Sequence, residues 1–249
     1  MSKAGDQHRG RTRDGRFMTT RWSVVRAAGD SAAPEHQKAL SALCETYWFP
    51  LYAYLRRRGH DANEAADFTQ AFFAQMLDKH YLRQVRPAPG KFRSFLLTAL
   101  KHFVANEYKR ARAKKRGGGR SILSLDHDEA ESRYALEPAT DISPERLFEK
   151  AWALTVLRQT MDRLQAELAA KKREKLFEHL RAYLVADQAA VPYADLADQL
   201  DMSEGAVRVA AHRLRKRCKA ILREEVAQTV ATRDEVDEEI RGLFAALSD

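Results

Sequence analysis

Residues 191–222 read VPYADLADQLDMSEGAVRVAAHRLRKRCKAIL, and this stretch decides the expected fold. Two stripes of apolar residues recur there at helical spacing, the first at Tyr193, Leu196, Ala197 and Leu200 and the second at Val207, Ala211, Leu214 and Cys218. Asp201 and Met202 fall between the stripes as a turn, and Ser203 is a preferred N-cap residue for the helix that follows. A short helix, a turn and a capped second helix predict a helix-turn-helix unit.

The outer face of the second helix is cationic, because no acidic residue occurs from Arg208 to Arg223. Gly205 and Ala206 keep its beginning narrow enough to enter the major groove of DNA, which is about 12 Å wide. Early positions of such a helix contact base edges, and later cations bind mainly phosphates. The predicted contacts to duplex DNA are Ser203, Arg208, Val209, His212, Arg213, Arg215 and Lys216. The alternative is a helical hairpin whose cationic face is merely solvated.

The composition of the chain favours an anionic partner and a reducing compartment. Its 249 residues carry a net charge of +8, which favours nucleic acid or a membrane surface. Cys44 and Cys218 lie far apart and lack the spacing of a zinc site or a disulfide framework. No apolar run approaches the roughly 18 residues that span a bilayer, and the polar N-terminus lacks a signal-peptide core. We therefore expect a cytoplasmic protein with no membrane partner, metal or cofactor.

Charge and proline content divide the chain into five expected segments. Residues 1–18 form a flexible basic arm, 19–116 a first helical domain, 117–149 an acidic linker, 150–225 a second helical domain with the helix-turn-helix, and 226–249 an acidic extension. No segment alternates like a strand. The expected fold is therefore all-α, with two small helical domains joined by an acidic linker.

Apolar stripes place the helices of the first domain. The first stripe, which we expect to be kinked or broken near Pro50, comprises Leu40, Leu43, Tyr47, Leu51 and Leu55. The second comprises Ala65, Phe68, Phe72 and Met76, and the third Phe92, Phe95, Leu96, Ala99, Leu100, Phe103 and Val104. In the linker, Ser143 followed by Pro144 and Glu145 predicts the start of another helix.

The third helix of this domain interleaves aromatic and basic residues, in the stretch GKFRSFLLTALKHFVANEYKRARAKKR at residues 90–116. Single-stranded bases stack on aromatic faces while nearby cations bind the phosphates. The helical spacing of Phe92, Phe95 and Phe103 nevertheless favours a place in the core. The predicted surface contacts are Lys91, Arg93, Lys101, His102, Asn106, Lys109 and Arg110.

These motifs together resemble a known family. DANEAADFTQAFFAQML at residues 61–77, the cationic helix, an acidic linker and the helix-turn-helix follow one another in the order found in extracytoplasmic-function (group 4) sigma factors of the sigma-70 superfamily. The resemblance covers about residues 35–116, as domain 2, and 150–225, as domain 4. It implies a bacterial transcription initiation factor that has no enzymatic activity of its own.

The resemblance also implies partners and roles. Domain 2 would dock on the clamp helices of core RNA polymerase through Asp61, Glu64, Asp67 and Gln70, and would melt the −10 element of promoter DNA with the cationic helix. The loop from Val85 to Lys91 resembles the one that receives a flipped-out base. Domain 4 would read the −35 element as duplex and touch the polymerase flap.

The docking segment departs from the family pattern. Typical members are strongly acidic there, whereas Asn63 and Ala71 stand in this stretch. Thr69 lies between them, and a phosphate on it would add about −1.5 to −2 charges. We therefore treat Thr69 as a candidate phosphosite that switches polymerase affinity, with an ordinary helix-surface threonine as the favoured alternative. A Ser/Thr kinase or an anti-sigma factor is the corresponding regulatory partner.

The acidic extension from Glu224 to Asp249 lies beyond the resemblance, and residues 236–247 predict a short amphipathic helix in it. It could fold back on a basic face as an autoinhibitor, dock a partner, or add solubility, and solubility is the favoured interpretation.

Three other classes of protein remain as alternatives. A stand-alone helix-turn-helix regulator would bind duplex DNA without polymerase, usually as a dimer, but the chain has no obvious heptad repeat. An enzyme acting on nucleic acid would need metal-binding carboxylates or an activated nucleophile, and no GxxxxGK[ST] loop or zinc spacing is present. An adaptor that binds only protein would not need two cationic helices.

Overall fold

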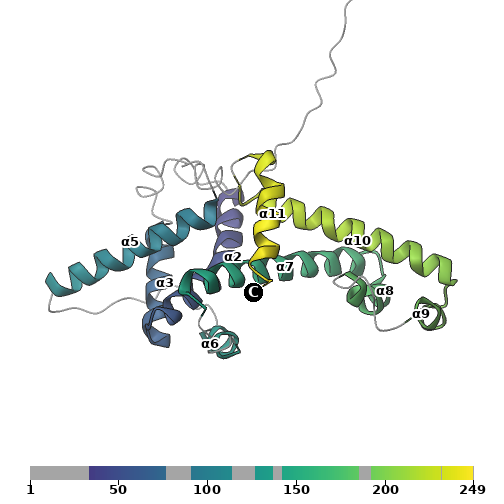
Figure 1. Cartoon of the computed structure of the whole chain (residues 1–249), viewed down its shortest axis with the longest axis horizontal. Coiled ribbons are helices and arrows are strands. Elements are labelled where there is room, and N and C mark those ends of the chain that lie inside the picture. The colour runs from purple at the N-terminus through teal and green to yellow at the C-terminus, as the bar shows by residue number, and fades with distance from the viewer. Residues whose placement is uncertain are drawn as a thin grey trace, which may run out of the picture.

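The computed structural model describes residues 34–76, 91–113, 127–136, 142–184, 192–230 and 232–248. Every regular element within these ranges is a helix, which confirms the all-α prediction. The molecule is elongated, with the helix-turn-helix unit towards one end of Figure 1 and the end of α5 (Phe92–Ala113) at the other. The basic arm at residues 1–18 lies outside the described residues.

The first core forms around α2 (Pro34–Arg57), which packs against α3 (Ala62–Met76), α5 and α7 (Pro144–Ala169). The predicted α2 stripe is buried where its side chains are described, at Leu43, Tyr47, Leu51 and Leu55. A break at Pro50 is wrong, because α2 continues through this residue. A proline removes one helical hydrogen bond, and Pro50 sits in a buried run of α2 where packing holds the helix together.

Helix α7 begins where the sequence predicts. The Ser143 hydroxyl accepts a hydrogen bond from the Arg146 backbone N–H at 3.2 Å, and Pro144 is the first helical residue. The first half of α7 buries Phe148 and Trp152 in the first core, and its second half contributes Leu164 to a second core. The expected domain boundary at residue 150 therefore falls inside one continuous helix.

The second core gathers the helix-turn-helix and its supports. It is built from α8 (Glu174–Leu180), the 3-10 helix η1 (Arg181–Leu184), α9 (Tyr193–Leu200) and α10 (Glu204–Ala227) as far as Ile221. The rings of Tyr183 and Tyr193 stack with centroids 5.0 Å apart and join η1 to α9. Helix α10 then runs back alongside α7 towards the first core (Figure 1).

The described part of the acidic linker is helical and packed. Helix α6 (His127–Ala135) lies against α2, where Glu131 accepts hydrogen bonds from Tyr52 and from Arg56, the latter at 2.7 Å. Arg133 lies over the Phe49 ring at 3.6 Å from its centroid. Glu131 and Arg133 of the predicted linker therefore contact α2, whereas Glu129 of the same helix is exposed.

The acidic extension also belongs to the first core. After η2 (Arg233–Glu235), helix α11 (Val236–Ala245) buries Val236 and Leu243 beside the last turns of α10. The amphipathic helix was predicted correctly. A purely solubilising role for it is wrong, because its apolar face completes a core that includes α2, α5 and α7.

Ion pairs connect α10 to α7 between the two cores. Arg217 donates to both carboxylate oxygens of Glu167, at 2.7 and 2.5 Å, and also to Glu224 at 3.2 Å. Arg163 pairs with Glu224 and with Glu225, the latter at 3.0 Å. Several charges that share partners in this way form a network, which is more effective than isolated surface pairs.

This network gives the α7–α10 seam a pH dependence. Because Arg217 donates hydrogen bonds to the Glu167 carboxylate, the pKa of Glu167 lies below its ordinary value of 4.5. A carboxylate with a lowered folded-state pKa contributes stability that is present above its unfolded pKa and is lost as the pH falls through the folded one. We therefore expect the urea concentration at the unfolding midpoint to decrease as the pH is lowered below about 4.5. In Glu167→Gln this decrease should be smaller. Glu178→Gln, which removes a carboxylate 50% exposed and 3.9 Å from Arg181, is the control that keeps the wild-type profile.

Candidate nucleic-acid interface

The turn between α9 and α10 has the geometry expected for the motif. Helix α9 ends at Leu200, and the φ of 51° at the following residue, Asp201, lies in the left-handed region that aspartate tolerates better than most residues. The backbone N–H of Met202 donates to the Ala197 carbonyl at 3.0 Å and closes the turn. The predicted turn at residues 201 and 202 is therefore confirmed.

The first turn of α10 is capped as predicted. The Ser203 hydroxyl accepts from the Ala206 backbone N–H at 3.3 Å, and Glu204 sits in the first turn at the positive end of the helix dipole. Below this turn, Val207 and Ala211 are buried against Leu196 and Ala197 of α9 in the second core. The cap and the apolar stripe together fix which face of α10 points outward.

The outward face of α10 carries the residues predicted for duplex DNA. Ser203, Arg208, Val209, His212, Arg213 and Lys216 are exposed, and Arg215 is half-buried. Val209 is unusual for an aliphatic residue because 49% of it is exposed. Arg208 bonds Glu204 at 2.5 Å, and its guanidinium lies 5.7 Å from the centre of the Tyr193 ring. The helix thus offers one apolar contact beside several cations.

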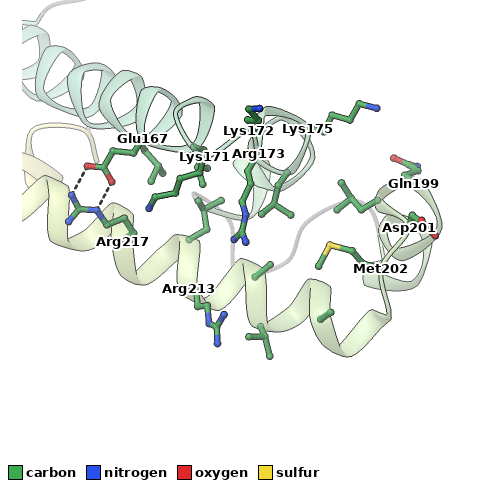
Figure 2. Close-up of a pocket in the computed structure, with 18 residues that line it drawn as sticks. Glu167, Lys171, Lys172, Arg173, Lys175, Gln199, Asp201, Met202, Arg213 and Arg217 are labelled. Atoms are coloured by element: carbon green, nitrogen blue, oxygen red, sulfur yellow. Dashed lines mark hydrogen bonds and ion pairs between the residues drawn. The ribbon is translucent and has the colours of Figure 1, made fainter.

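A cavity of about 770 Å³ adjoins this face between α7, α8, α9 and α10 (Figure 2). Its floor is apolar and includes Leu164, Leu168, Leu176, Leu200, Met202 and Leu214. Its charged lining is mostly basic: Glu167 and Asp201 stand against Lys171, Lys172, Arg173, Lys175, Arg213 and Arg217. Val209 and Arg213 line both the cavity and the outward face of α10. We refer to this feature as the basic-rimmed groove.

Sequence reasoning missed the basic-rimmed groove. The run KKREK at residues 171–175 was the available signal, because it joins two helices without an apolar stripe. Lys172 has a φ of 56°, so the chain turns sharply there and brings the cationic run opposite the turn before α10. That juxtaposition depends on tertiary packing and has no signature of its own in the sequence.

Helix α5 exposes most of the residues predicted to contact unpaired DNA. Lys101, His102, Asn106, Lys109 and Arg110 are exposed. Lys101 bonds Glu145 at 2.8 Å, which lowers the pKa of that carboxyl, and Arg110 bonds Glu107 at 2.7 Å. His102 and Asn106 line a small cavity of about 50 Å³ together with Phe72, Gln75 and Met76 of α3.

Arg93 is a correction, because it does not face solvent. Only 5% of its side chain is exposed, and it pairs with Glu149 and with Glu239 while lying 4.3 Å from the centre of the Trp152 ring. The position shares a face of α5 with the buried Leu97 and Leu100, which lie four and seven residues later. Lys91, just before the helix, is half-buried and pairs with Glu238 and Glu239. In this conformation the Arg93 side chain is therefore not accessible to DNA.

Helix α3 carries the residues predicted to bind polymerase. Asp61, Glu64 and Asp67 are exposed, and Gln70 is half-buried. The Asp61 carboxylate accepts from the Glu64 backbone N–H at 2.8 Å, so it also caps the helix. At the adjoining corner, His60 stacks on Tyr108 and meets the edge of Phe68, which ties the α2–α3 turn to α5.

Thr69 is a second correction. Its side chain is fully buried, and its hydroxyl donates to the Ala65 carbonyl at 2.7 Å. Ala65, Thr69, Phe72 and Met76 form the buried stripe of α3, whereas Phe68 is only half-buried. Both the phosphosite and the ordinary surface threonine are therefore wrong, because a kinase cannot reach this hydroxyl in the folded protein.

The described residues provide little for other chemistry. No group of three or more His, Cys, Asp and Glu side chains among them could hold a metal ion. Burial raises the pKa of the Cys44 thiol to about 11 and raises that of Cys218, so neither is prepared as a thiolate nucleophile. None of the helices in the described ranges combines the length and apolar character that crossing a membrane requires.

Comparison of the chain with known proteins finds no family model, no characterised protein and no solved structure that matches it.

Proposed function

We propose that the protein is a bacterial transcription initiation factor of the sigma type, which binds core RNA polymerase and directs it to promoters. The observation that carries this proposal is the capped, one-sided cationic helix α10, in a chain that also exposes a second cationic helix, α5. A single DNA-reading helix would suffice for a regulator. Two DNA-facing helices on different parts of one elongated molecule favour two contacts on one promoter. A cytoplasmic location follows from this function.

Reading of the −35 element is assigned to the outward face of α10. Arg208 and His212 lie in the early turns, where side chains reach base edges in the major groove. The exposed Val209 fits the methyl group of a thymine, which is the apolar feature of that groove. Lys216, two turns after Arg208, is placed for a phosphate.

Melting of the −10 element is assigned to the exposed side of α5. His102 and Asn106 supply hydrogen-bonding groups over the small cavity beside Phe72, and Lys109 and Arg110 supply cations for phosphates. Of the loop proposed to receive a flipped base, only Lys91 lies within the described residues.

Two surfaces are assigned to polymerase. The exposed acids of α3 suit the basic clamp helices that the family resemblance implies. The basic-rimmed groove suits the flap, because an apolar floor with a mostly basic charged lining accepts an amphipathic helix with acidic flanks. An anti-sigma factor of the same chemistry would compete for this groove.

The test is run-off transcription with core polymerase on a genomic promoter library, using wild type and two arginine variants. Loss of a base-reading arginine costs about 1–3 kcal/mol. We therefore expect Arg208→Ala to reduce promoter-specific transcripts about tenfold. Arg181→Ala removes an equally exposed arginine from η1 and should leave them unchanged. Equal promoter affinity with and without polymerase would instead identify a stand-alone regulator, and no specific start above core polymerase alone would refute the proposal.

A further inference from the structure

Helix α11 lies at the point where it meets α5, α7 and α10. Its buried face consists of Val236, Glu239 and Leu243. This face packs on α7 and α10, and its Glu239 pairs with Arg93 at the start of α5. Figure 1 shows α11 crossing the point from which α5 extends to one side and the α7–α10 pair to the other. The two helices proposed to bind DNA therefore meet through this short segment.

The contact contains a buried cluster of charges. Only 1% of the Glu239 side chain is exposed, and its carboxylate pairs with Arg93 and lies 3.3 Å from Lys91. Arg93 also pairs with Glu149 of α7, and Lys91 lies 3.7 Å from the exposed Glu238. Both cations precede or begin α5, so α11 neutralises the start of that helix.

The fit around this cluster is close. A Cβ atom at Gly242 would lie 3.3 Å from Arg93 Nη2 and 3.3 Å from Lys91 Nζ, so the glycine lets the α11 backbone approach both cations. The Phe92 backbone N–H donates to the Thr229 carbonyl at 3.3 Å, which joins α5 to the chain just after α10. Arg223 of α10 pairs with Asp237 of α11. The position of α11 is thus specified from α5, α7 and α10 together.

The contact between Glu239 and the two cations is one in which another anion can replace the carboxylate. A buried ion pair adds little net stability, since desolvation offsets the attraction, although it strongly specifies geometry. A helix of 10 residues is marginal by itself, so α11 depends on its docked contacts. A guanidinium group binds phosphate in the same two-pronged geometry as a carboxylate, and an ammonium group binds either anion as a point charge. A phosphate backbone is therefore a natural competitor for the two cations that Glu239 occupies.

We propose that α11 is an autoinhibitory latch. In the free protein Glu239 occupies Lys91 and Arg93, and α11 holds α5 and α10 in one fixed arrangement. DNA phosphates displace the carboxylate, which frees the start of α5 and lets the two DNA-binding parts adjust to the promoter. This latch deepens the proposed function and rests on it, because it assigns the start of α5 to DNA.

The matched test compares two adjacent carboxylates in the full-length chain. Glu239→Gln removes the buried charge and keeps the side-chain shape, whereas Glu238→Gln makes the same change on a side chain that is 64% exposed. Gly242→Leu keeps every charge and wedges α11 away from Lys91 and Arg93. Binding of each free protein to a 30-nucleotide single strand of mixed sequence is measured by fluorescence anisotropy over a range of salt concentrations.

We expect Glu239→Gln and Gly242→Leu to bind the strand about tenfold more tightly and Glu238→Gln to stay within about twofold of wild type. Two further phosphate contacts should steepen the slope of log affinity against log salt by about 1.4. Hydrogen exchange provides an independent readout: DNA should accelerate exchange of the α11 amides in wild type, and Glu239→Gln should show that acceleration without DNA.

Failures of the two proposals are distinguishable. Faster α11 exchange on DNA without promoter-specific transcription would keep the latch and refute the sigma-type function. Specific transcription with unchanged or weaker binding by Glu239→Gln and Gly242→Leu would refute the latch. Slow α11 exchange in wild type both with and without DNA would also refute it, even if both variants failed to fold, because α11 would then be a fixed part of the core.

Discussion

Trp152→Ala is expected to remove 3–5 kcal/mol, roughly, from the free energy of unfolding. Trp152 has no exposed surface, lies in the half of α7 that packs on α2, and supports the Arg93 guanidinium at 4.3 Å from its ring centre. Its truncation would leave a cavity that rigid helices on several sides cannot fill. Since the free energy of unfolding of a domain is commonly about 5–15 kcal/mol, this single change should remove a large part of the protein's stability.

Urea denaturation followed by circular dichroism at the helix band measures this effect. Leu154→Ala is the control on the same helix, since 39% of Leu154 is exposed, and it should change stability by no more than about 0.5 kcal/mol. Because α7 is continuous and contributes to both cores, we also expect a single transition in both variants. A Trp152→Ala midpoint equal to that of Leu154→Ala would show that the first core does not depend on α7.

The features predicted correctly from the sequence are those that local rules determine. The caps at Ser143 and Ser203 and the stripe from Val207 to Leu214 each depend on residues a few positions apart. Helical periodicity and capping preferences act over that range. The all-α fold and the turn at Asp201 follow from them without knowledge of the tertiary structure.

The errors arise where a distant segment decides the environment. Arg93 was assigned to the surface by its charge, although its spacing from Leu97 and Leu100 places it on the core side of α5. Its partner Glu239 comes from the other end of the chain, and no local pattern reveals that pairing. The packing of α6 on α2 was missed for the same reason, because an acidic, proline-flanked segment has the composition of a solvated linker.

Thr69 illustrates a finer limit of periodicity. The predicted stripe was correct at Ala65, Phe72 and Met76, which are buried, but Thr69 is buried beside them whereas Phe68 is only half-buried. A threonine is compatible with either environment, because its hydroxyl can bond the carbonyl four residues earlier. Only the packing of α3 against α2 and α5 places Thr69 inside.

Thr69→Glu is consequently expected to unfold the first core instead of mimicking an activating phosphate. Its carboxylate would enter the stripe formed by Ala65, Phe72 and Phe73, where an unpaired buried charge costs about 3–5 kcal/mol. Thr69→Val keeps the shape and removes only the hydroxyl bond to Ala65, whose carbonyl retains its helical partner. We expect that variant to lie within about 1.5 kcal/mol of wild type.

Ala71→Glu places a carboxylate on the exposed side of α3, and so tests the effect of added charge without the effect of burying it. Ala71 is exposed, so a carboxylate there stays in water and should leave the urea midpoint unchanged. Under the proposed function it also adds an acid to the surface that faces the clamp, so we expect tighter binding to core polymerase in a pull-down titration. Thr69→Glu should bind less, because its docking helix is no longer held in place. A stable Thr69→Glu protein that binds polymerase more tightly than Ala71→Glu would restore the switch at Thr69 and contradict the buried position of its side chain.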